Sequence, residues 1–220
     1  MSDEEITFLI DKELKEKTLG VTEQYLEIHR PLYTNGKLKI ERIDREREDN
    51  VVIAYLPVAE EVFFFTVFVD TSNSEIINMG TESFNKVYFH ASSENLSKIQ
   101  LESICSLAAT EGRNKGDLRG LTGLVKYKYS YVNYLPNPEP DSIVDKLEKL
   151  LNFLEEDKEG VRRLVEEANG YIQVAMDIHN ANGMIGGPFI SRKMVERMNN
   201  LGLAIDFDLY VGGNSFLEHN

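Results

Sequence analysis

Residues 62–69 limit the fold more than any other part of this sequence. The run Val-Phe-Phe-Phe-Thr-Val-Phe-Val is apolar at every position except Thr66. A membrane-spanning helix needs about 20 apolar residues, so this run is too short to cross a bilayer. Because apolar residues fall on both faces of an extended chain, the run predicts a central strand that is covered on both sides. The alternative is an exposed aromatic face that docks a partner.

The segments around this run predict the first part of the fold. We expect helices over residues 4–17 and 22–29, with Pro31 ending the second. Strands are expected over residues 37–43, 50–56, 62–70 and 74–80. Asn35-Gly36 supplies a strong turn signal before them. Residues 1–82 are therefore predicted to form a subdomain of helix plus antiparallel β-meander.

The remainder, residues 83–220, alternates strands with helices. Strands are expected over 87–91, 124–134, 171–179 and 203–211, and helices over 97–108, 143–154, 159–168 and 191–201. Ser97 and Gln100 form a capping-box pattern at the start of one helix. The outward strand positions are polar, which favours a four-stranded sheet with helices mainly on one face, an α/β sandwich. The whole chain is predicted to be an α+β protein.

Charge and cysteine content narrow the class of protein. The formal net charge is −13, with no basic block large enough to bind nucleic acid through its phosphates. This charge either steers a basic protein partner or serves solubility alone. Cys105 is the single cysteine, and the first residues are acidic where a secretion signal would be basic. We therefore expect a cytoplasmic protein that binds neither nucleic acid nor membrane.

Four features of residues 87–210 resemble one known family. They are the Ser-led helix start at 96–101, the Lys-Gly-Asp loop within 110–117, a long amphipathic helix after the middle strand, and the closing strand at 201–210. This segment resembles the bacterial family catalogued as domain of unknown function 4279. The resemblance implies the fold and carries no activity. The first eighty or so residues lie outside it.

Residues 112–120, Gly-Arg-Asn-Lys-Gly-Asp-Leu-Arg-Gly, form a loop rich in glycine and cations. Backbone amides freed by glycine, with cations nearby, can hold an anion. The candidate ligand-binding residues are Arg113, Lys115, Gly116, Asp117 and Arg119. The alternative is a structural connector in which Gly116 takes a positive φ and Asp117 bonds local backbone.

A second constellation is acidic. Asp177 and His179 alternate with apolar residues in one predicted strand, and Asp206 and Asp208 do so in another. If the two strands are neighbours, these four side chains share the outer face of the sheet and could bind a metal ion or perform acid–base chemistry. The alternative is a solvated face on which Lys126 and Lys128 balance the aspartates.

No cofactor motif and no nucleophile–base pattern is present, so we expect no cofactor and favour a binding module over an enzyme, with enzyme activity left open. The favoured function is a non-catalytic protein-binding or regulatory module with a basic protein partner. The alternatives are a small-anion or ligand sensor that uses the 112–120 loop and a metal-assisted hydrolase on the outer sheet face. The catalytic residues, the substrate and the oligomeric state are left open.

Overall fold

The computed structural model describes residues 1–220 except 48, 121–124, 180–186 and 214–220. It contains helices and mainly antiparallel sheets, which confirms the α+β class. The described residues divide into two compact units by packing. The first comprises residues 1–84, 177–179 and 209–213, and the second comprises 85–176 and 187–208. No helix in the described part of the chain is both long and apolar enough to span a bilayer.

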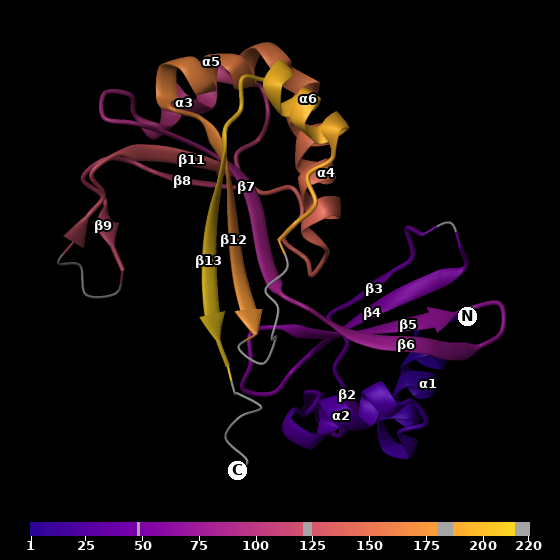
Figure 1. The fold of residues 1–220 in the computed structure, drawn as a ribbon. Helices are drawn as coiled ribbons and strands as arrows, with labels where there is room; N and C mark the ends of the chain where they lie inside the picture. Colours follow the sequence, from indigo (N-terminus) through magenta and orange to yellow (C-terminus); the bar gives the residue numbers. More distant parts are fainter. Residues whose placement is uncertain (48, 121–124, 180–186, 214–220) are drawn as a thin grey trace. The chain divides into compact units, whose positions relative to one another are not determined.

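The first unit is built on an antiparallel meander, drawn in purple in Figure 1. Its elements are α1 (Asp3–Glu16), α2 (Gly20–Ile28), β1 (Tyr33–Thr34), β2 (Lys37–Leu38), β3 (Arg42–Asp44), β4 (Val51–Pro57), β5 (Phe64–Asp70) and β6 (Glu75–Glu82). The sheet order β3-β4-β5-β6 follows the chain, as the predicted meander requires. Strand β1 pairs separately with β2.

The apolar run that opened the sequence analysis becomes β5, an interior strand of this sheet. Phe65, Val67 and Val69 are buried in one core with Ile6 and Ile10 of α1. On the other face Thr66 is buried, whereas Phe64 and Phe68 are half-buried. Strand β5 is therefore central, as expected, with one face completely covered and the other covered in part.

The remaining elements form a second sheet with helices. They are β7 (Phe84–Ser93), α3 (Lys98–Ile104), β8 (Glu111–Arg113), β9 (Leu118–Arg119), β10 (Val125–Lys126), β11 (Ser130–Tyr134), α4 (Ile143–Leu154), the 3-10 turn η1 (Glu155–Asp157), α5 (Lys158–Ala168), β12 (Tyr171–His179), α6 (Arg192–Asn200) and β13 (Ile205–Gly212). The sheet order is β13-β12-β7-β11-β8. Figure 1 draws β12 and β13 pointing in the same direction.

This sheet has five strands, one more than the four expected. The additional strand is β8, whose three residues pair antiparallel with β11. Glu111-Gly112-Arg113 is too short and too polar to be recognised as a strand. It becomes one because β11 offers it unpaired backbone groups, which is a tertiary effect.

The single strand expected over residues 124–134 is also wrong, because two strands lie there. Strand β10 pairs with β9 in a separate hairpin, whereas β11 pairs with β7 and β8. Around Tyr127 the backbone still bonds to the 112–120 loop, through Gly116 N to Tyr127 O at 2.9 Å and Tyr127 N to Asp117 O at 2.9 Å. The backbone therefore changes its hydrogen-bond partners between residues 127 and 130, from the 112–120 loop to strands β7 and β8. The alternation of side chains that predicted one strand does not reveal this change.

Candidate functional site

The register of β7, β11 and β8 separates the two faces of the five-stranded sheet. Phe89 lies opposite Tyr134, and both are buried. The ring of Tyr134 lies 6.4 Å from that of Phe153 on α4, so this face carries the helices. His90 lies opposite Asn133 and therefore points to the other face.

This second face has aromatic rings at its centre and acids at its edges, and we call it the tyrosine face. Its members are His90 on β7, Tyr131 on β11, Tyr171 on β12, Glu111 and Arg113 on β8, and Asp206 and Asp208 on β13. The rings are half-buried and the three carboxylates are exposed. Because β8 and β13 are opposite ends of the strand order, the carboxylates border the rings on both sides.

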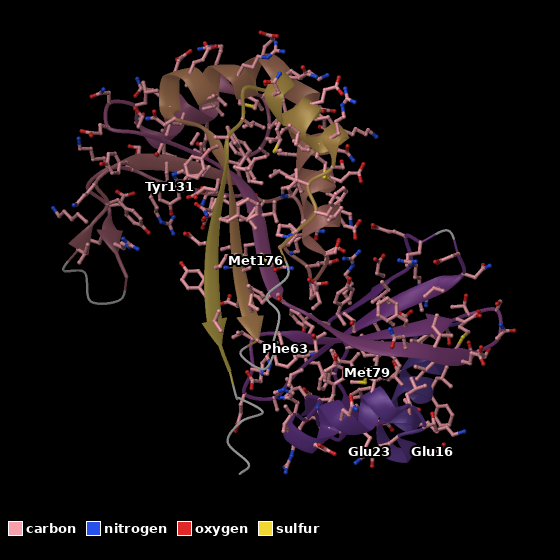
Figure 2. The ribbon with its side chains drawn as sticks, in the orientation of Figure 1. Glu16, Glu23, Phe63, Met79, Tyr131 and Met176 are labelled. Atoms are coloured by element: carbon pink, nitrogen blue, oxygen red, sulfur yellow. The ribbon has the colours of Figure 1, made fainter. Side chains whose placement is uncertain are left out.

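The aromatic rings contact one another across the strands. His90 stacks on Tyr131 with ring centroids 5.7 Å apart and an interplanar angle of 29°. It also meets the ring of Tyr171 edge-on at 5.4 Å. Tyr127 extends the row, 5.5 Å from Tyr131. Figure 2 labels Tyr131 in this sheet. Such contacts hold the rings in place, so the face is preorganised.

A short hydrogen-bond chain orients His90. The side-chain amide of Asn133 donates to Glu111 Oε1 at 2.7 Å, and Asn133 Oδ1 lies 2.7 Å from His90 Nδ1. Since the amide oxygen can only accept, His90 donates from Nδ1. The other ring nitrogen, Nε2, is then a hydrogen-bond acceptor whenever the imidazole is neutral.

Burial and neighbouring charges set the protonation of the face. Burial lowers the pKa of His90, with Asn133 and Glu111 opposing this shift, so the imidazole is neutral at pH 7. Burial raises the pKa of Tyr131 to about 12, and the side-chain hydrogen bond with Tyr127 is the second-largest cause of this shift. Burial raises the pKa of Tyr171, with Asp206 and Asp208 adding to the shift. The rings are therefore neutral, and the charge of the face comes from its carboxylates and from Arg113.

The structure places three of the predicted anion-binding residues, Lys115, Gly116 and Asp117, in the connector between β8 and β9. Gly116 has φ +92°, and Asp117 Oδ2 accepts from Asn114 N at 2.9 Å. Lys115 Nζ donates to the carbonyl oxygen of Glu94 at 3.3 Å. Arg113 lies in the five-stranded sheet, whereas Arg119 lies in the β9–β10 hairpin. These contacts are those expected of a structural connector, and anion binding there stays a prediction.

The predicted metal-binding set is divided. Asp206 and Asp208 are exposed on β13 and border the tyrosine face, whereas Asp177 is half-buried in β12 and His179 is buried at the end of that strand. Within the described ranges, one group of three potential ligands lies within 4.8 Å, and it consists of His29, Glu61 and His179. Lys126, which the alternative of a solvated sheet face pairs with the aspartates, lies in the β9–β10 hairpin and outside the five-stranded sheet.

Sequence reasoning singled out His179 but missed His29 and Glu61 as its neighbours. These three residues are distributed over 150 positions of the chain, without any spacing typical of a metal motif. It also missed His90 and Glu111 as parts of one face. Only the register between neighbouring strands places His90 and Glu111 on one face. The sequence alone does not specify that register.

The comparisons with known proteins concern the same part of the chain as the tyrosine face. No curated protein and no solved structure shows significant similarity to the chain. The family model described as "Domain of unknown function (DUF4279)" matches residues 82–212, which include the whole five-stranded sheet. The chain therefore belongs to the DUF4279 family.

Proposed function

We propose that this protein is a non-catalytic binding module that recognises a basic segment of a partner protein on its tyrosine face. The observation that carries the proposal is the layout of the face, with His90, Tyr131 and Tyr171 between edges that carry Glu111 on one side and Asp206 and Asp208 on the other. The net charge of −13 supports it, because it attracts basic partners.

Each group of the face has a role toward a lysine or arginine side chain. An aromatic ring attracts a cation placed over it, with about 0.5–1 kcal/mol at exposed sites. Asp206 and Asp208 are within electrostatic range of Tyr171, so one cation can contact both the ring and a carboxylate. Nε2 of a neutral His90 accepts a hydrogen bond from an ammonium or guanidinium group. Arg113 is the one cation that β8 contributes to this face, beside Glu111.

The test is titration of a fluorescent oligo-arginine peptide into the full chain, followed by anisotropy. The double variant Asp206→Asn/Asp208→Asn should weaken binding about 2- to 30-fold, since each exposed ion pair contributes about 0.2–1 kcal/mol. The matched control is Glu148→Gln/Glu156→Gln, which removes the same charge from exposed positions of α4 and η1. Equal weakening by both double variants would show attraction by net charge alone and contradict the proposal.

The aromatic contribution is tested separately at Tyr171. Tyr171→Ala should weaken peptide binding about 2- to 5-fold, because the ring is lost. Tyr171→Phe keeps the ring and should bind within about twofold of the unchanged chain. If the two variants bind the peptide equally, the ring does not contact the cation.

We also propose that the protein is cytoplasmic. Its role would be regulatory, exerted by binding the basic partner. A cytoplasmic protein keeps its thiols reduced, and the single Cys105 is buried, where burial raises its pKa to about 11. A thiol with that pKa is protonated at pH 7, so Cys105 is a poor nucleophile.

A further inference from the structure

The strongest unassigned feature is a buried cluster of two histidines and a glutamate in the first unit. His29 directly follows α2, Glu61 lies in the connection before β5, and His179 is the last residue of β12. Their side chains are 2%, 3% and 6% exposed, respectively. Three side chains that can ligate a metal thus meet in the interior from three distant parts of the chain.

The distances between their ligand atoms suit a shared ion better than direct hydrogen bonds. Glu61 Oε1 lies 3.7 Å from His29 Nδ1 and 3.7 Å from His179 Nε2. Hydrogen bonds between nitrogen and oxygen are about 2.7–3.2 Å long. Two ligands that each lie 2.0–2.1 Å from a tetrahedral ion are about 3.4 Å apart. A contraction of a few tenths of an ångström therefore brings Glu61 Oε1 to this separation from each of the two imidazole nitrogens, and all three ligand atoms lie within 4.8 Å of one another.

The apolar ring of Phe63 packs against both histidines of the cluster. The ring of Phe63 lies 5.1 Å from that of His29 and 4.4 Å from that of His179. The two imidazoles meet edge-on at 4.6 Å. Figure 2 labels Phe63. Burial of this degree strengthens the attraction between a carboxylate and a cation.

The backbone at Gly213 approaches the ligands so closely that only glycine fits. A Cβ atom there would lie 2.4 Å from Glu61 Oε2 and 3.1 Å from His179 Nε2, and the φ of Gly213 is +89°. Next to Glu61, Glu60 has φ +65°, a conformation that side-chain-bearing residues rarely adopt. Backbone conformations of this kind persist where the surrounding structure enforces them, and they cluster at functional sites.

We propose that His29, Glu61 and His179 bind one divalent first-row transition-metal ion, with zinc as the preferred ion. Two imidazole nitrogens and one carboxylate oxygen are ligands typical of zinc, whereas calcium and magnesium take oxygen ligands. With neutral imidazoles the three side chains carry one negative charge, which the ion offsets. The site belongs to the first unit and is independent of the tyrosine face.

The test uses the full chain without an affinity tag, freed of metal by a chelator and titrated with Zn²⁺. One ion should bind per chain. His29→Gln, Glu61→Gln and His179→Gln should each weaken Zn²⁺ binding by at least about a hundredfold, since loss of an outer-shell partner alone costs 10- to 100-fold. Gly213→Ala should also weaken it, although it leaves all three ligands in place.

The controls are His90→Gln, in the second unit, and His219→Gln, outside the described residues. Both should bind Zn²⁺ within about twofold of the unchanged chain. Because substitutions of buried residues can unfold a protein, circular dichroism accompanies each variant, and X-ray absorption of the unchanged chain loaded with zinc gives the ligands directly. Lack of saturable binding, equal loss in the controls, or coordination without two imidazoles would overturn the proposal.

Discussion

At the residue scale, Asp157 shows how one carboxylate joins two elements of the second unit. It caps the start of α5, where Oδ1 accepts from Gly160 N at 2.9 Å. Its other oxygen accepts from Ser106 N at 2.6 Å and from Ser106 Oγ at 2.8 Å, just after α3. The Ser106 and Gly160 amides together lower the pKa of Asp157 to about 2.

We expect Asp157→Ala to lower the free energy of unfolding at pH 7 by about 0.5–2 kcal/mol, the range for loss of an N-cap. Because the folded state lowers this pKa, the contribution is present above the unfolded value near 4 and disappears as the pH falls toward 2. Urea denaturation at pH 7, 4 and 2.5 should therefore show a shrinking difference. Glu156→Ala, an exposed neighbour, should change stability by about 0.5 kcal/mol or less. A difference that stays constant with pH would contradict the charge-dependent cap.

At the element scale, β8 depends on Gly112. A Cβ atom at this position would lie 2.7 Å from the carbonyl oxygen of Tyr131 and 3.0 Å from Lys98 Cε. The first contact is with backbone of the strand that β8 pairs with, so it cannot be relieved by a rotamer change. Glycine thus allows β8 to approach β11 and to place Glu111 on the tyrosine face.

We expect Gly112→Ala to destabilise the protein by about 1–3 kcal/mol, the usual cost of overpacking. It should also raise hydrogen exchange of the β8 amides, since the strand is displaced from β11. Gly187→Ala is the matched control, because a Cβ atom at Gly187 would meet nothing within 4 Å. Equal stability of the two variants, by thermal unfolding, would show that β8 tolerates the added methyl group.

At the scale of the whole molecule, the net charge of −13 attracts basic partners before they make contact. Screening shortens the reach of exposed charges from about 10 Å at 0.1 M salt to about 3 Å at 1 M. We expect oligo-arginine binding to weaken steadily over this range, as measured by anisotropy. Zn²⁺ binding should change much less with salt, because the His29–Glu61–His179 cluster is buried. Peptide binding that is independent of salt would exclude the electrostatic model of recognition.

Local sequence signals predicted most helix ends correctly. The capping box of Ser97 and Gln100 is present at α3, and the backbone of Asn169 ends α5 in the left-handed region, with φ +50°. Ser191 caps α6 as expected. These signals work because a cap is satisfied by atoms within four residues of it. The strand predictions were wrong where pairing with a distant strand determines the structure. They missed β8, and they missed the break between β10 and β11.

The sequence by itself determined the α+β class, the family and the central position of β5, because each follows from patterns within short, continuous segments. Tertiary structure alone decided which functional side chains meet. His90 joins Glu111 and Tyr171 through cross-strand register, and His29 joins Glu61 and His179 through packing of remote segments. The physical reason is that hydrogen-bond caps and periodicity are local, whereas a site requires long-range proximity, which only the complete packed chain specifies.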